Sequence, residues 1–296
     1  MWRVRERSSR FPSANVWREY EGLSCERCVD PERRRRLPHS QGAQLMNSSF
    51  ADHFSALSRS YAEFRPKYPA ALFDFLATQV PREATVWDCA AGNGQATLDL
   101  AKRFARVFGT DASAEQIASA PAVPSIEWRV APADHSGLPE ASVDLVTVAQ
   151  AIHWFPFDRF YAEVRRVLTP GGLLAVWAYG ACGVDAPAVQ ELITEYYESI
   201  VGSFWPPERR FVEEGYRTIP FPFAELECPA ISMQADWKLD ELLGYFGTWS
   251  ATHRYRKATD LDPLEPLRAS LLPHWGDPAQ ARRIVWPLAL RAGRVE

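Results

Sequence analysis

The segment VWDCAAGNGQATLDLA, residues 86–101, decides the fold of this 296-residue chain. Its first part is a short apolar run typical of a buried strand, and its last part has the apolar spacing of a helix. Between them, Gly92 and Gly94 predict a tight turn, because glycine permits positive φ and lets a ligand approach the backbone closely. The segment therefore predicts a strand, a ligand-binding turn and a helix in direct succession.

Strands and helices alternate on both sides of this segment. Strands that alternate with helices of about ten residues form βαβ units, and right-handed crossovers then give a parallel sheet with helices on both faces. The expected fold class is therefore α/β, a doubly wound Rossmann-like sheet that binds ligands at the carboxyl ends of its strands. Strands are predicted at 84–90, 105–113, 126–134, 143–152 and 173–180, and helices at 70–80, 96–105, 114–120 and 157–168.

The remaining residues, 181–296, predict a helical cap and the end of the sheet. EYYESIVGSFW (195–205) and LDELLGYFGTWSATHRY (239–255) read as aromatic-rich helices, and ISMQADW (231–237) and ARRIVWPLAL (281–290) read as late strands. We expect a seven-stranded, mostly parallel sheet with an antiparallel edge. Residues 47–180 would form the cofactor-binding core, and the later helices would roof the substrate pocket.

Charge is distributed unevenly along the chain. Residues 1–46 hold ten arginines against six acidic residues, although the whole chain has a formal net charge of −4. This segment lacks periodicity and aliphatic residues, which predicts a disordered basic tail or a misassigned start that precedes a true start at Met46. The lone Cys25–Cys28 pair disfavours a zinc site, and no metal-ligand cluster is expected elsewhere.

Composition also excludes several partners. The chain as a whole is weakly acidic, which argues against nucleic acid as the main partner. No apolar run approaches the roughly 20 residues that span a bilayer. No secretory signal pattern is present, which favours a cytoplasmic protein. We expect a monomer or a homodimer.

The nature of the ligand follows from Gly92, Asp88 and Asp111. Asp111 ends the second strand, 17 residues after Gly94, where an acid accepts hydrogen bonds from both ribose hydroxyls. The dinucleotide fingerprint fails, because its third glycine is replaced by Thr97. A carboxylate at Asp88 would repel a pyrophosphate but could receive the ammonium of an amino-acid cofactor. S-adenosylmethionine therefore fits better than NAD.

The motifs together resemble a known family. VWDCAAGNGQATLDLA is similar to the glycine loop (D-x-G-x-G-x-G) of class I S-adenosylmethionine-dependent methyltransferases, and FGTDAS (108–113) to their ribose-binding strand end. DLVTVAQAIHWF (144–155) and VLTPGGLLAVWAYG (167–180) are similar to their fourth and fifth strands. YAEFRPKYP (61–69), HWF (153–155), WPPERR (205–210) and TWSATHRY (248–255) resemble the small-molecule subgroup that includes trans-aconitate methyltransferases.

The resemblance implies a set of site residues. His153 would be a catalytic base, and Tyr61 would line the sulfonium pocket, where an aromatic face attracts a cation. Arg65, Trp154, Trp249 and Tyr255 would contact substrate, with Arg65 pairing with an acidic substrate or with the cofactor carboxylate. Cofactor contacts are expected from Asp88, Ala90, Gly92, Gly94, Gln95, Asp111, Ala112, Ala133, Asp134, Ala149 and Gln150.

Two positions depart from the family pattern. Ala90 stands where the first glycine of the loop is usual, and we expect alanine to serve there with ordinary φ. Family members usually have a pair of acidic residues that contact adenine. Pro132 replaces the first of them, so Asp134 is the remaining acidic residue for this contact.

The expected activity is methyl transfer from S-adenosylmethionine to a small molecule, with O-methylation of a carboxylate favoured by the subgroup. A carboxylate acceptor is ionised at pH 7 and needs no base, whereas a hydroxyl or carbon acceptor would need one. Two alternatives stay open from the sequence. One is a nicotinamide-dependent oxidoreductase, and the other is a non-catalytic protein that binds S-adenosylmethionine.

Overall fold

The structure is a computed structural model that describes residues 64–295. These residues belong to the second of the two units into which the chain divides, His53–Glu296. The predictions for residues 1–46, including Cys25, Cys28 and Met46, and the prediction for Tyr61 lie outside the described residues.

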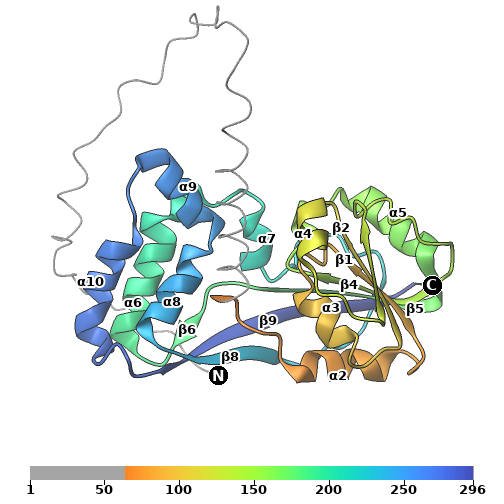
Figure 1. Ribbon diagram of the computed structural model, residues 1–296, viewed down its shortest axis with the longest axis horizontal. Coiled ribbons are helices and arrows are strands. Elements are labelled where there is room, and N and C mark those ends of the chain that lie inside the picture. Colours follow the sequence, from red (N-terminus) through yellow and green to blue (C-terminus); the bar gives the residue numbers. More distant parts are fainter. Residues whose placement is uncertain (1–63, 296) are drawn as a thin grey trace, which may run out of the picture. The chain divides into compact units, whose positions relative to one another are not determined.

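The sheet runs in the order β3-β2-β1-β4-β5-β9, and β8 pairs with β9 (Figure 1). Neighbours from β3 to β5 are parallel, whereas β9 is antiparallel to both β5 and β8. Apart from two-residue strands, the described sheet therefore has the seven strands and the antiparallel element that the sequence predicts. The strands are β1 (Thr85–Cys89), β2 (Arg106–Asp111), β3 (Ile126–Val130), β4 (Val143–Ala149), β5 (Leu168–Tyr179), β6 (Gly183–Val184), β7 (Ala224–Glu225), β8 (Ile231–Trp237) and β9 (Arg282–Arg294).

Helices cover both faces of the sheet, because side chains alternate along each strand. On β5, Leu173 and Trp177 join one apolar cluster with α2 and α3, while Leu174 and Val176 join the other with α5. The helices on the two faces are α2 (Ala70–Gln79), α3 (Gln95–Leu100), α4 (Ala114–Ser119) and α5 (Phe157–Val167). This arrangement is the doubly wound α/β fold predicted from the alternation of strands and helices.

The later helices are α6 (Pro187–Glu195), α7 (Arg209–Glu213), α8 (Leu239–Gly247), α9 (Ser250–Thr259) and α10 (Leu264–Trp275). Buried residues of α6, α8 and α10 continue the cluster that also contains Leu173 and Trp177. Three short helices complete the described part of the chain: η1 (Ile152–Trp154), η2 (Tyr196–Ile200) and η3 (Gly202–Phe204).

Two predictions for these later helices need correction. The helix expected over 195–205 is divided into the π-helical η2 and the 3₁₀-helical η3, and the helix expected over 239–255 is divided into α8 and α9. The sequence prediction also missed α6, α7 and α10, the last of which carries Pro273 inside it. Within residues 64–295, no helix is both long and apolar enough to cross a membrane.

Candidate functional site

A cavity of about 350 Å³ opens where the carboxyl ends of β1, β2, β4 and β5 meet. In the strand order, β1 lies between β2 and β4, so the order reverses at this point, which is where doubly wound sheets bind ligands. The cavity is lined by Tyr68, Asp88, Ala90, Ala91, Gly92, Asn93, Gln95, Ala96, Asp111, Gln116, Ala149, Gln150 and Tyr179. Seven of the eleven predicted cofactor residues are among them: Asp88, Ala90, Gly92, Gln95, Asp111, Ala149 and Gln150.

Asp111 joins the glycine turn to the end of β2. Its Oδ2 accepts a hydrogen bond from the backbone N–H of Gly92 at 2.9 Å, and its Oδ1 accepts one from Ser113 at 2.8 Å. A carboxylate oxygen can accept more than one hydrogen bond. Asp111 therefore keeps acceptor capacity at the cavity, which fits the pair of hydroxyls on a ribose.

The two glycines of the turn have different surroundings. A Cβ on Gly92 would meet only Gln116 Oε1, at 3.8 Å, so this glycine leaves the cavity wall open. A Cβ on Gly94 would lie 2.7 Å from the ring of Trp128, and Gly94 has a φ of 98°. Gly94 is thus required by the packing of Trp128 and by its backbone, and it is not a cavity residue.

Ala90 and Gln150 end neighbouring strands in the left-handed conformation, with φ of 55° and 57°. The expectation of an ordinary φ at Ala90 is therefore wrong, because the turn keeps the conformation for which glycine is usual. Gln150 is anchored to the end of β5, where its Nε2 donates to the carbonyl of Tyr179 at 2.9 Å. Strained backbone of this kind often marks a functional site.

Asp88 is fully buried beneath the turn. Its carboxylate accepts hydrogen bonds from Thr97 on α3 at 2.5 Å and from Thr147 on β4 at 2.7 Å. Burial raises the pKa of Asp88 to about 6, against the lowering effect of the two threonines. Thr97 stands where the dinucleotide fingerprint has its third glycine. In this structure its hydroxyl fixes the carboxylate of Asp88 by a hydrogen bond.

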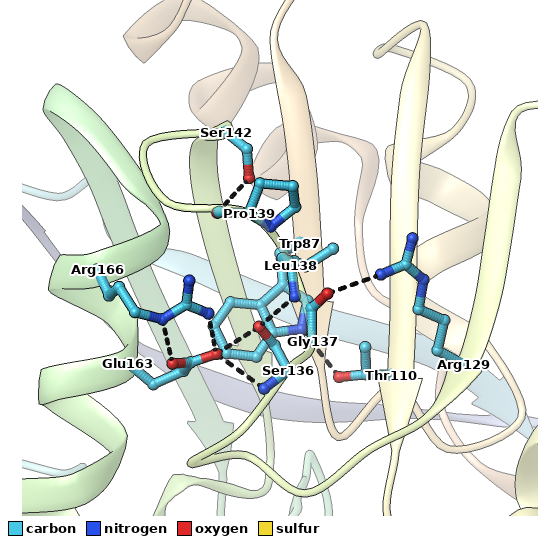
Figure 2. Close-up of polar contacts among 10 residues, drawn as sticks. All are labelled: Trp87, Thr110, Arg129, Ser136, Gly137, Leu138, Pro139, Ser142, Glu163 and Arg166. Carbon is cyan, nitrogen blue, oxygen red and sulfur yellow. Dashed lines mark hydrogen bonds and ion pairs between the residues drawn. The ribbon is translucent and has the colours of Figure 1, made fainter.

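The loop after β3 is attached to α5. Asp134 forms an ion pair with Arg159. Figure 2 shows that Glu163 accepts hydrogen bonds from the backbone N–H and the hydroxyl of Ser136. Arg166 donates to both oxygens of Glu163, at 2.7 and 2.8 Å. Ala112, Ala133 and Asp134, three of the predicted cofactor residues, are not among the described residues that line the cavity.

His153 lies in η1, three residues after Gln150. Its Nδ1 is 2.9 Å from the hydroxyl of Tyr216, and its ring centroid is 4.9 Å from that of Trp154. Burial and the nearby Arg209 lower the pKa of His153 to about 4. Trp154 is 54% exposed, a large fraction for a tryptophan beside a candidate site.

The other predicted substrate residues occupy two environments. Arg65 donates to the hydroxyl of Tyr179 at 3.1 Å, and its guanidinium carbon lies 5.8 Å from the ring centroid of Tyr245. Trp249 is buried against aromatic side chains such as Tyr196, and Tyr255 packs edge-on against Phe204. Arg65 thus contacts Tyr179, which lines the cavity, whereas Trp249 and Tyr255 are not among the residues that line it.

The sequence prediction missed three cavity residues with larger side chains. Tyr68, Gln116 and Tyr179 come from the segment before α2, from α4 and from the end of β5. Tyr179 could have been found from its place at a strand's carboxyl end, and Tyr68 from its place in the segment 61–69 that resembles the small-molecule subgroup. Gln116 carries no such signal. In the part of the chain that the structure describes, no cluster of His, Cys, Asp or Glu could hold a metal ion.

The chain is similar to known methyltransferases. The family model described as a methyltransferase domain matches residues 87–176. A Dictyostelium discoideum protein, provisionally named a methyltransferase, is 36% identical over 230 residues, which cover 76% of this chain and 87% of that protein. A solved structure from Anaeromyxobacter dehalogenans, provisionally titled a type II methyltransferase, is 46% identical with a TM-score of 0.74, and the match covers 78% of this chain and 97% of that one.

A third relative names a substrate. The trans-aconitate 2-methyltransferase of Azoarcus sp. is 38% identical over 124 residues, which cover 40% of this chain and 48% of that protein. The match thus spans about half the length of this relative.

Proposed function

The chain belongs to the class I S-adenosylmethionine-dependent methyltransferases, and we propose that it methylates a carboxylate oxygen of a small molecule. S-adenosylmethionine, when bound, supplies a methyl group that is already activated by its sulfonium. We assign Asp111 to the ribose hydroxyls and the turn at Gly92 to the close approach of the cofactor. Gln150 and Asp88 would border the methionine part, with Asp88 acting through its hold on the turn.

The contact between Arg65 and Tyr179 is the observation that supports a carboxylate as the methyl acceptor. Tyr179 lines the cavity, and its hydroxyl accepts a hydrogen bond from Nη1 of Arg65. A guanidinium presents several donors in a planar fork that matches a carboxylate. Arg65 therefore brings a positive charge to the edge of the cavity, where it would favour an acidic substrate.

The chemistry of the site is consistent with this acceptor. A carboxylate is ionised at pH 7, so the protein has only to align it, hold it and exclude water. The similarity to a trans-aconitate 2-methyltransferase over 124 residues supports an acidic substrate. Trans-aconitate is accordingly the first acid to test.

The test is methyl transfer from isotope-labelled S-adenosylmethionine to a panel of acids, headed by trans-aconitate, beside matched alcohols and amines. We expect a base-labile methyl ester from at least one acid and no product from its alcohol analogue. Transfer to alcohols or amines, with none to acids, would contradict the carboxylate proposal.

A substitution at Arg65 distinguishes its two possible roles, which are binding the acidic substrate and binding the carboxylate of the cofactor. Arg65→Gln should raise the KM for the acid by about 10- to 100-fold, the value of a hydrogen bond to a charged group, and leave cofactor affinity unchanged. Arg82→Gln, at an exposed arginine before β1, is the matched control. Loss of cofactor affinity in Arg65→Gln would instead assign Arg65 to the cofactor carboxylate.

A further inference from the structure

Tyr216 is held in an unfavourable backbone conformation. It follows α7 with a φ of 59°, directly after Gly215 with a φ of 60°. A bulky residue in this region is strained and persists only where its surroundings fix it. Arg291 supplies that restraint, because its Nη1 donates to the carbonyls of Tyr216 and Ile219 at 2.7 and 2.8 Å.

The strained turn directs the hydroxyl of Tyr216 to His153. The side chain is 1% exposed, and its Oη lies 2.9 Å from Nδ1 of His153. Among residues 64–295, this imidazole nitrogen is the one hydrogen-bond partner of the hydroxyl. The ring of His153 is also fixed from the side by Trp154, 4.9 Å away between centroids.

The direction of this hydrogen bond decides the tautomer of His153. If Nδ1–H donated to the tyrosine oxygen, the hydroxyl hydrogen of Tyr216 would be buried without an acceptor, which costs free energy. If the hydroxyl donates to Nδ1, both groups are satisfied. The proton of the neutral imidazole then sits on Nε2, because a neutral ring carries one N–H.

The protonation states of Tyr216 and His153 agree with a hydrogen bond that the tyrosine hydroxyl donates to Nδ1. Burial raises the pKa of Tyr216, so its hydroxyl keeps its proton, and burial together with Arg209 of α7 lowers the pKa of His153 to about 4. Arg209 donates through Nε to the hydroxyl of Tyr197, so this cation lies beside the pair but is directed to another partner. His153 is therefore a neutral ring at neutral pH.

We propose that Tyr216 is a positioning residue that fixes His153 as the Nε2–H tautomer, and that His153 donates a hydrogen bond to the acceptor oxygen instead of acting as a general base. The proposal rests on the proposed function for the identity of that oxygen as a carboxylate. His153 is not itself one of the residues that line the cavity, but it follows β4, whose end at Ala149 and Gln150 does line it. Its Nε2 has no partner among the described residues, so this nitrogen is open to a ligand.

A donor at this place suits a carboxylate better than a neutral acceptor. Methylation of a carboxylate oxygen forms one C–O bond and breaks the methyl–sulfur bond, whose electron pair stays on sulfur. No proton is released, so no base is needed. An Nε2–H group helps to hold the anion and discriminates against an alcohol, which would need its proton removed.

The direct test is the two-bond ¹H–¹⁵N NMR spectrum of the full chain labelled in its histidine rings, with His153 assigned by its loss in His153→Gln. We expect a neutral Nε2–H pattern that does not titrate between about pH 5.5 and 8. In Tyr216→Phe the Nδ1–H form should become populated. Tyr161→Phe, which removes another buried tyrosine hydroxyl donating to the Pro220 carbonyl, should leave the pattern unchanged.

An Nδ1–H pattern in the wild type, or titration of His153 near pH 6.5, would overturn the proposal. This spectrum is recorded without substrate, so its outcome is separate from the success or failure of the acid panel.

Activity tests the donor role with the acids that the enzyme methylates. His153→Gln keeps an N–H donor and should retain kcat/KM within about threefold, whereas His153→Leu should lose about tenfold or more. The wild-type rate should show no rise through the pH range in which an imidazole base titrates. Equal activities in the two variants, or a rate that rises with a pKa near 6.5, would contradict the donor role.

Discussion

Asp88 on β1 and Thr147 on β4 are joined by a buried hydrogen bond, with 2.7 Å between the carboxylate and hydroxyl oxygens. The other carboxylate oxygen accepts from Thr97 on α3. Two central strands and the helix after the glycine turn thus meet at one buried carboxylate. This contact holds the turn at the point where the strand order reverses, directly beside the cavity.

Asp88 should make stability depend on pH in an unusual direction. Its pKa is raised by burial from 3.8 to about 6, so its stabilising contribution is complete below about pH 4 and is lost as pH rises through 6. In urea unfolding, the wild type should lose about 2 kcal/mol relative to Asp88→Asn between pH 4 and 7. Parallel pH curves for the two proteins would contradict the assignment.

Ala90→Gly should stabilise the protein. The left-handed conformation at Ala90 costs an L-residue about 1–2 kcal/mol, part of which is offset by the greater freedom of glycine in the unfolded chain. We expect a gain of about 0.5–1 kcal/mol in thermal or urea unfolding. Ala91→Gly is the control, and it should destabilise because Ala91 lacks a positive φ. A loss of stability in both variants would refute this view of the turn.

Gly94→Ala and Gly92→Ala should separate packing from binding. The Gly94 variant should lose about 2 kcal/mol or more of folding stability, because its Cβ would lie 2.7 Å from Trp128 at a φ of 98°. The Gly92 variant should lose about 1 kcal/mol and bind the cofactor more weakly, because its methyl enters the cavity wall. Unfolding curves and cofactor titrations of both variants check this, and the reverse ranking of stabilities would count against it.

Glu163→Gln should weaken the attachment of the loop after β3 (Figure 2). Burial alone would raise the pKa of Glu163, but hydrogen bonds from Arg166 and Ser136 outweigh it and lower the pKa to about 2. The contribution is therefore present above about pH 4.5 and is lost as pH falls toward 2.

We expect the Gln variant to lose about 2 kcal/mol at pH 7, after allowance for screening at the partly exposed Arg166, and to approach the wild type in acid. Ser142→Ala, at a half-buried serine of the same loop whose hydroxyl makes an exposed hydrogen bond to the carbonyl of Pro139, should be nearly neutral. A loss that persists unchanged at low pH would show that the ionised pair is not the cause.

Local pattern was enough to predict the parts of the fold that depend on neighbouring residues. The strand, turn and helix around Gly92, the strand ending at Asp111 and the late strand β9 all follow from apolar spacing and turn residues. The helix α10 was missed because its two prolines, Pro266 and Pro273, read as helix breakers. Division of the helix expected over 195–205 also needed tertiary packing to be known.

The site was predicted less completely, because several of its contacts join residues distant in the chain. Trp128 reaches Gly94 only because β3 lies beside β2 in the sheet, and Tyr216 reaches His153 across 63 residues. Family likeness suggested a cofactor role for Asp134, but its partner Arg159 lies on a helix whose face the sequence does not reveal. Such pairings follow from the strand order and helix orientation rather than from any local motif.

Calorimetric titration with S-adenosylmethionine tests the central claim most directly, that the cavity at Asp111 and Gly92 binds this cofactor. The wild type should bind one molecule per chain, and Asp111→Asn should bind about 10- to 100-fold more weakly while circular dichroism reports an intact fold. Asp99→Ala, at an acid of α3 paired with Lys102, should match the wild type. Equal affinities in the wild type and Asp111→Asn, or no binding by the wild type, would contradict the account.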